Sequence, residues 1–149
     1  MRELRFRIWI KDEERYYDES DEESYLIVPN GNVTYTSEAY EENGAWFTDT
    51  TSATNDVIVE QYTGLKDKNG KEIYEGDIVE QFVCGVKTFR GKPCGRRTIW
   101  QVRWNEEECC FELHYLSGSL FGDSLMNKDD ELEVIGNIHE NQELLEGYK

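Results

Sequence analysis

The sequence predicts a mainly β fold: a small SH3-like barrel in the C-terminal part, an N-terminal β lobe and a short C-terminal helix. Short runs rich in apolar and β-branched residues recur along the chain, turns containing glycine separate them, and the clearest helical pattern stands at the end. We expect an acidic N-terminal lobe over residues 1–60 and the barrel over residues 61–149. A single unit over residues 1–149 is the alternative.

The N-terminal lobe is expected to contain a strand and a hairpin. RELRFRIWI, from Arg2, alternates apolar and charged residues as a half-buried strand does. The charged stretch over 11–24 predicts an exposed loop. β-rich runs flank Pro29-Asn30-Gly31, and Asn-Gly suits a tight hairpin turn because both residues tolerate positive φ. We expect a short helix over 37–43, ended by Gly44.

The stretch TGLKDKNGKEIYEGDIVE, residues 63–80, is the most regular passage of the chain. We interpret it as a scaffold in which polar turns lead into the barrel, with turn residues Gly64, Asp67, Asn69, Gly70, Gly76 and Asp77. A recognition loop formed by Asp67, Lys68, Asn69 and Lys71 is the alternative. A calcium loop is excluded because a loop starting at Asp67 would have Glu72 at position six and Ile78 at position twelve.

A long hairpin and a final strand and helix complete the expected elements. The hairpin arms are QFVCGVKTF and RRTIWQVRW, with the tip over 90–95. The last segment predicts a strand over 132–138, followed by a helix with Asn141 as its N-cap and Gly147 as its stop.

The charge is unevenly distributed. The net charge is −16. Residues 1–60 carry 5 basic and 15 acidic side chains, residues 61–104 carry 9 and 5, and residues 105–149 carry 2 and 12. Between Gln81 and Trp104 there is no acid at all. One cationic segment therefore stands in an anionic protein.

The residue inventory argues against an enzyme, a metal site or a cofactor. The two histidines, His114 and His139, are interpreted as packing or surface residues, so no catalytic residue is assigned. The cysteines form no CxxC pair, which disfavours zinc, and the expected state is reduced thiols; their positions are 84, 94, 109 and 110. No apolar run is long enough to span a bilayer or form a signal peptide, so a cytoplasmic protein is expected.

Three segments carry a resemblance to a known family. MRELRFRIW at the start, YTGLKDKNGKEIYEGDIV at 62–79 and EVIGNIHENQELL at 133–145 together resemble the YopX family of phage and prophage proteins. The resemblance implies a phage or prophage origin, a bacterial cytoplasmic location and self-association, but no known activity. One departure is Gln142, where the family pattern would place proline; proline is favoured but not required at this helical position.

These observations predict a non-enzymatic, self-assembling structural or interaction module. The residues expected to contact a partner, another subunit or a host or phage protein, are Lys87, Arg90, Lys92, Arg96 and Arg97. One alternative is a nucleic-acid-binding protein, because aromatic residues interleave with the basic ones of the hairpin. Another is a DNA mimic, whose acidic lobes would occupy the basic groove of a host protein.

Overall fold

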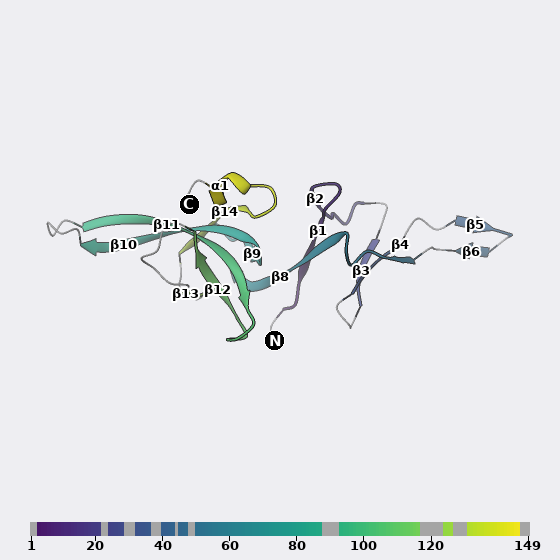
Figure 1. Ribbon diagram of the computed structural model, residues 1–149, viewed down its shortest axis with the longest axis horizontal. Coiled ribbons are helices and arrows are strands. Elements are labelled where there is room, and N and C mark those ends of the chain that lie inside the picture. The colour runs from purple at the N-terminus through teal and green to yellow at the C-terminus, as the bar shows by residue number, and fades with distance from the viewer. Residues whose placement is uncertain are drawn as a thin grey trace. The chain divides into compact units, whose positions relative to one another are not determined.

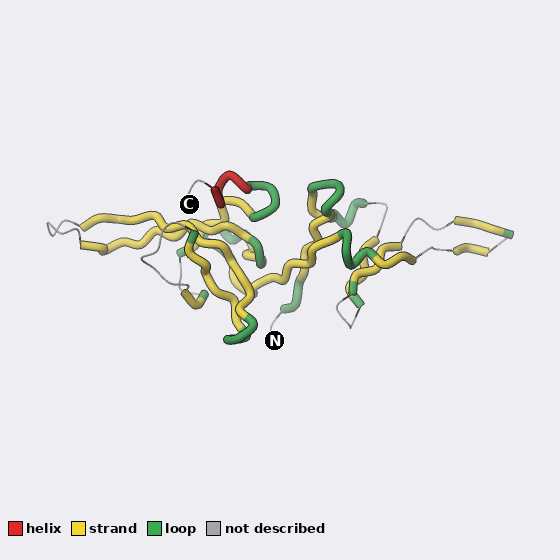
Figure 2. The backbone as a smooth tube through the Cα atoms, viewed as in Figure 1, coloured by secondary structure: helices red, strands yellow, loops and turns green. Residues whose placement is uncertain are grey.

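The chain is mainly β, as the sequence predicts. The structure is a computed structural model that describes residues 3–21, 24–28, 32–36, 40–43, 45–47, 50–87, 93–116, 124–126 and 131–146. Strands dominate these residues, and the helix α1 (Gln142–Glu146) lies near the C-terminus (Figure 2). The antiparallel sheets curl and form a half-barrel. The expected fold class is therefore confirmed, with a half-barrel in the place of the barrel.

The described residues form fourteen strands, numbered in chain order, and Figure 1 labels those for which there is room. The first seven are β1 (Phe6–Ile10), β2 (Arg15–Tyr16), β3 (Ser24–Ile27), β4 (Val33–Thr36), β5 (Tyr40–Glu42), β6 (Ala45–Phe47) and β7 (Thr50–Ser52). The others are β8 (Val57–Lys66), β9 (Glu72–Tyr74), β10 (Asp77–Lys87), β11 (Pro93–Asn105), β12 (Cys110–Tyr115), β13 (Ser124–Leu125) and β14 (Leu132–Asn137). Their sheet orders are β2-β1-β8-β9, β13-β12-β11-β10-β14, β3-β4-β7 and β5-β6.

The chain forms two compact units. Unit 1 consists of Met1–Phe6 and Glu60–Lys149, and unit 2 consists of Arg7–Val59. The core of unit 1 lies where β9 packs on the five-stranded sheet, and its buried residues are Ile73, Val79, Trp100, Val102, Phe111, Leu113 and Leu132. The core of unit 2 is smaller, with buried residues Ile8, Val33, Ala53 and Val57. Each unit therefore buries apolar residues of its own.

Several expected elements are found where the sequence places them. β3 and β4 pair antiparallel and form the hairpin around residues 29–31, which lie outside the described residues. β10 and β11 form the long hairpin, and β14 and α1 follow at the end. The hairpin tip was expected over 90–95, but residues 93–95 belong to β11, in which Pro93 pairs with Lys87 and Cys94 with Val86; residues 90–92 lie outside the described residues.

The helix expected over 37–43 is wrong for the residues that the structure describes there. Tyr40–Glu42 is strand β5, paired with β6. Asn43 has a φ of 53° and separates the two strands. A glycine after a polar run is typical of a helix stop, but Asn43-Gly44 is also the dipeptide that favours a two-residue hairpin turn. Turn chemistry and the aromatic residues of β6 outweighed the helical pattern here.

Candidate functional site

The long hairpin extends beyond its neighbouring strands. β14 pairs with β10 between Asp77 and Gln81, and β12 pairs with β11 between Trp100 and Asn105. Beyond those pairs, Phe82 faces Arg97, Val83 faces Arg96 and Lys87 faces Pro93. We call Phe82–Lys87 with Pro93–Arg97 the cationic arm. Among the described residues it is a two-stranded ribbon, and Figure 1 shows it projecting from the other strands of its sheet.

The cationic arm brings together three of the five predicted partner residues. Lys87, Arg96 and Arg97 stand on its strands, whereas Arg90 and Lys92 lie outside the described residues. The side chain of Arg97 is 72% exposed, and its Nη1 lies 3.3 Å from Oε2 of Glu80. An exposed ion pair of this length holds the guanidinium weakly. Arg97 is therefore available for a stronger pair with another molecule.

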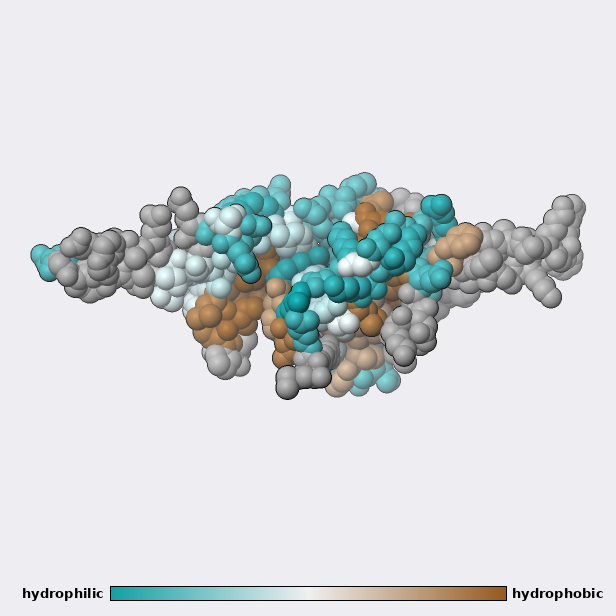
Figure 3. Space-filling view, turned by 180° about the vertical axis from the view of Figure 1, so that it is seen from behind, coloured by the Kyte–Doolittle hydropathy of each residue, from teal (hydrophilic) through white to brown (hydrophobic). Residues whose placement is uncertain are grey.

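An exposed aromatic ring lies opposite this arginine. Phe82 is 51% exposed and directly faces Arg97 across the ladder. Trp104, further along β11, is 38% exposed and packs edge-on against Phe111 at a centroid distance of 5.1 Å. Brown apolar patches interrupt the teal polar surface in the space-filling view (Figure 3). The base of the cationic arm thus offers an apolar ring beside a cation, a pairing that favours protein and nucleic-acid contacts alike.

The turn over residues 67–70 is organised by a buried carboxylate. Asp67 is 7% exposed, and its side chain accepts hydrogen bonds from the backbone N–H of Asn69 at 2.8 Å, Lys71 at 2.9 Å and Val134 at 3.1 Å. Burial alone would raise the pKa of Asp67, but these backbone donors hold its pKa below the ordinary value. Its contacts join the turn to β14, which is what a scaffold residue does.

Other residues of this turn have more open surroundings. Gly70 lies in this turn, whereas Gly64, which was expected in a turn, lies within β8, where the pairing with β9 shifts register between Tyr62 and Lys66. Their φ values are 87° and 89°, and a Cβ at either would meet nothing within 4 Å. Lys68 and Asn69 are exposed, and Nζ of Lys68 lies 2.6 Å from Oε2 of Glu133. Lys71 is exposed as well. The alternative of a recognition loop thus keeps its exposed members, while Asp67 itself is buried.

The turn over residues 75–77 covers a buried carboxylate–histidine pair that the sequence does not indicate. Oδ2 of Asp77, which is 1% exposed, accepts the backbone N–H of Tyr74 at 2.8 Å. Nε2 of His139 lies 2.9 Å from Oε1 of Glu60, with side-chain exposures of 11% and 3%. Gly76 has a φ of 80°, and a Cβ there would overlap Oε1 of Glu60. The turn therefore needs glycine both for its backbone and for the carboxylate beneath it.

The remaining histidine and two of the thiols lie on or beside β12. His114 is half-buried on β12, opposite Gln101. Cys109 and Cys110 are free thiols, and Cys109 lies in the turn before β12 with a φ of 51°. Within the described ranges, no three His, Cys, Asp or Glu side chains are placed to hold a metal ion. No helix in that part of the chain is long and apolar enough to cross a membrane.

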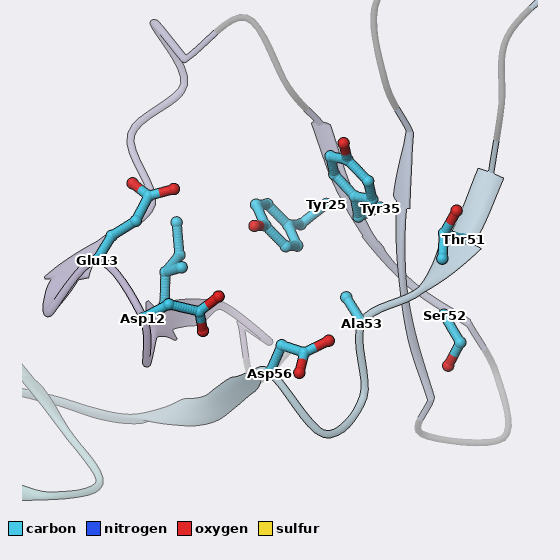
Figure 4. A pocket seen from close by; sticks show the side chains of 9 residues that line it. Asp12, Glu13, Tyr25, Tyr35, Thr51, Ser52, Ala53 and Asp56 are labelled. Atoms are coloured by element: carbon cyan, nitrogen blue, oxygen red, sulfur yellow. The ribbon is translucent and has the colours of Figure 1, made fainter.

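Unit 2 contains a cavity of about 250 Å³ that the sequence analysis missed. Its buried floor includes Ile10 and Ala53, which are 4% and 5% exposed. Half-buried Tyr25 and Tyr35 form one wall, and Figure 4 shows them across the cavity from the backbone of Asp12 and Glu13. The other lining residues are Thr51, Ser52 and Asp56. The cavity combines aromatic rings with carboxylates.

The acids of the cavity differ in their partners. Glu13 accepts a hydrogen bond from Nε of Arg15 at 2.6 Å. Asp12 and Asp56 are exposed, and neither makes an ion pair within the described residues. The nearest lysine in sequence is Lys11, whose ammonium group donates a hydrogen bond to the backbone oxygen of Asn55 at 2.6 Å. Two carboxylates thus remain beside the tyrosine rings.

The half-barrel, the ordered turns and the projecting hairpin define a class of small, mainly β protein. The chain belongs to the YopX family, whose profile, described as YopX protein, matches residues 5–146. No curated protein matches the chain.

Two solved structures share the fold. Protein EF1440 from Enterococcus faecalis has a TM-score of 0.54 and 26% sequence identity, over 95% of this chain and 97% of that one. YopX from Bacillus subtilis has a TM-score of 0.56 and 21% identity, over 100% of both chains. Neither description states an activity, so these two likenesses show the fold and do not indicate a role.

Proposed function

We propose that this YopX-family protein is a non-enzymatic, self-assembling interaction module that binds other copies of itself through the cationic arm. One observation carries the proposal: a two-stranded ribbon leaves its sheet with an exposed phenylalanine and an exposed arginine facing each other at its base. An isolated two-stranded ribbon is at best marginally stable in water. A partner that covers the ribbon would stabilise it.

A second copy is the partner that the charges favour. The segment from Gln81 to Trp104 has no acid, while residues 1–60 carry 15 acids and 5 bases. Opposite charges on one chain steer copies toward each other and select the register of docking. The family resemblance adds an expectation of self-association, and of a phage or prophage protein that acts in the bacterial cytoplasm.

Nucleic acid is the second candidate, and a specific observation favours it. Phe82 and Trp104 are both exposed on the strands that carry the basic residues. Exposed rings beside cations can stack on bases while the cations contact phosphates. A DNA mimic is the third candidate. In this role the acidic side chains would imitate DNA phosphates and bind a basic partner, and its support is the large number of acidic residues.

Solution mass by light scattering tests the proposal. We expect the wild type to exceed the mass of one chain, and Arg96→Glu/Arg97→Glu to lose most of that excess because each contact becomes repulsive. Arg103→Glu is the control, because Arg103 is an exposed arginine of β11 outside the cationic arm. Salt should weaken the assembly by screening.

The same measurement with oligonucleotides separates the candidates. Self-assembly predicts a mass that single-stranded and double-stranded oligonucleotides leave unchanged. A salt-sensitive complex with one class of oligonucleotide, lost in the double variant, would favour nucleic-acid binding. A wild type with the mass of one chain, or a double variant with the wild-type mass, would overturn the proposal.

A further inference from the structure

The cavity of unit 2 has the features of a site for a cationic side chain. We propose that it takes an arginine from the cationic arm of a second copy of this chain. The tyrosine rings would stack on the guanidinium, and the carboxylates of Asp12 and Asp56 would accept its N–H groups. This inference rests on the proposed self-assembly and names the surface that the cationic arm docks on.

The charge of the cavity selects a cation. Its three ionisable acids are Asp12, Glu13 and Asp56, and it has no basic lining residue. Arg15 already forms an ion pair with Glu13, and Lys11 donates a hydrogen bond to the Asn55 carbonyl. These contacts of the two nearby cations do not involve the carboxylates of Asp12 and Asp56. Asp12 and Asp56 have no ion-pair partner within the part of the chain that the structure describes. An incoming cation would supply one.

The aromatic wall distinguishes this cavity from a simple acidic patch. Tyr25 and Tyr35 face each other across the β3–β4 ladder, with ring centroids 5.9 Å apart. Cations are attracted to the faces of such rings, most strongly where water is partly excluded. The buried methyl groups of Ala53 and Ile10 exclude water from the floor. Figure 4 shows the Tyr25 ring between Asp12 and Tyr35.

Shape and size favour arginine. The volume of about 250 Å³ is many times the roughly 30 Å³ that one water occupies in the liquid, yet it lies below the range of about 300–1,000 Å³ typical of drug-sized ligand sites. It therefore suits one side chain. Guanidinium is planar, stacks on aromatic faces and presents several donors to carboxylates, whereas ammonium is a compact, strongly hydrated charge.

The cationic arm supplies a suitable arginine. Arg97 is highly exposed, and among the described residues it forms an ion pair with Glu80, at 3.3 Å. Phe82, which is 51% exposed, faces Arg97 across the ladder and would dock together with it. Because the cavity and the cationic arm are different surfaces, the contact is heterologous, and each docked copy leaves one free cavity and one free arm. Such contacts close into rings or continue as filaments.

A complementation experiment tests this pairing. The arm variant is Arg96→Glu/Arg97→Glu, and the cavity variant is Asp12→Lys/Asp56→Lys. Each variant alone should have the mass of one chain by light scattering. An equal mixture should contain a dimer, because the intact arm of the cavity variant can dock in the intact cavity of the arm variant. The control, Glu19→Lys/Glu42→Lys, changes two exposed acids that do not line the cavity and should assemble like the wild type.

A small probe tests the cavity without assembly. N-acetyl-arginine amide should perturb the Tyr25 and Tyr35 ring resonances of the arm variant, whereas the uncharged isostere N-acetyl-citrulline amide should not. Asp12→Asn/Asp56→Asn, placed in the same arm variant, should weaken the arginine probe at least tenfold while keeping the shape of the side chains. Glu19→Gln in that background is the matched control.

The outcomes separate this inference from the proposed function. A cavity variant that assembles like the wild type would overturn the docking site and leave self-assembly through the cationic arm standing. A monomeric wild type would overturn self-assembly and the second-copy occupant together. Equal response to arginine and citrulline probes would overturn the cation site. Dimers in the mixture, with both variants monomeric alone, would support the whole proposal.

Discussion

The two units use acidic side chains in opposite ways. All five buried polar residues found in the described part of the chain lie in unit 1, and three of them are the acids Glu60, Asp67 and Asp77. No acid of unit 2 whose burial the structure describes is buried, and Asp12 and Asp56 stand at a cavity. A buried carboxylate must be hydrogen-bonded, whereas an exposed one remains available to a partner. The comparison therefore separates the buried acids of unit 1, which hold turns and strands together, from the exposed Asp12 and Asp56 of unit 2, which we propose to bind a partner.

The cores differ accordingly. Unit 2 buries apolar side chains over Ile8, Trp9, Ile10, Val33, Ala53 and Val57. Unit 1 adds polar contacts to its apolar core, in which Asp67 joins a turn to β14 and Glu60 meets His139. Buried polar contacts restrict the number of arrangements open to a chain, because a shifted register leaves them unpaired. We therefore expect unit 1 to respond more strongly to small changes at its turns.

The largest effect is expected at Gly76. Gly76→Ala should lower the free energy of unfolding by about 3–5 kcal/mol, because positive φ costs about 1–2 kcal/mol and the new Cβ would displace the buried carboxylate of Glu60. Gly70→Ala is the control: its φ is also positive, but a Cβ there has open space. Gly70→Ala should lower the free energy of unfolding by about 1–2 kcal/mol, which is the cost of positive φ alone.

Urea unfolding of both variants measures the difference. Equal losses for Gly76→Ala and Gly70→Ala would show that the Glu60–His139 pair moves aside without cost. The buried pair would then have no role in holding the turn.

A smaller effect is expected when the Asp67 carboxylate is removed. Asp67→Ala leaves three backbone N–H groups without their acceptor and should cost about 3 kcal/mol in thermal or urea unfolding. The matched change in unit 2 is Asp18→Ala. Asp18 also accepts a backbone N–H two residues on, from Ser20 at 2.9 Å, but it is exposed and water can replace it. A loss for Asp18→Ala as large as that for Asp67→Ala would contradict the assignment of scaffold acids to unit 1.

The fold could be predicted because its signals are local. Asn-Gly pairs, alternating apolar residues and the late Asn141 are visible in short windows of sequence, and they gave the β3–β4 hairpin, β10, β11, β14 and α1. Asn43-Gly44 is ambiguous in sequence, because glycine is common both at helix C-termini and in hairpin turns. Asn141 does precede α1, yet its Oδ1 accepts the backbone N–H of Asn137 at 3.2 Å. Its contact depends on where β14 lies, and the sequence does not show this.

The candidate site was predictable only in part. A run of basic residues without acids identifies the cationic arm directly, so Arg97 could be named from the sequence. The cavity depends on side chains far apart in the chain, such as Asp12 and Asp56, which many other acids conceal. The sequence does carry one signal for the cavity, because a hairpin centred on Asn30 places Tyr25 opposite Tyr35. The Glu60–His139 pair has no such signal, because its members are separated by 79 positions and join different elements.

The smallest expected effects concern pH, and they should differ in sign between the units. Burial, with the Glu60 carboxylate nearby, raises the pKa of Glu75 in unit 1 above its ordinary 4.5. The folded state then holds the Glu75 proton more tightly than the unfolded state, so this group stabilises the fold fully below pH 4.5, and the effect is lost as pH rises through the folded pKa. Glu75→Gln should raise the melting temperature at pH 7 and converge with the wild type in acid.

Asp21 in unit 2 provides the opposite case. Its hydrogen bond with Arg15 and the backbone N–H of Asp18 lower the pKa of Asp21 below its ordinary 3.8. Its contribution is present above pH 3.8 and is lost as pH falls through the folded pKa. Asp21→Asn should therefore lower the melting temperature at pH 7, with the difference shrinking in acid. Melting curves of both variants from pH 7 down to pH 3 would show this crossing, and a Glu75→Gln variant less stable than the wild type at pH 7 would mean that its ionised carboxylate supports the turn after all.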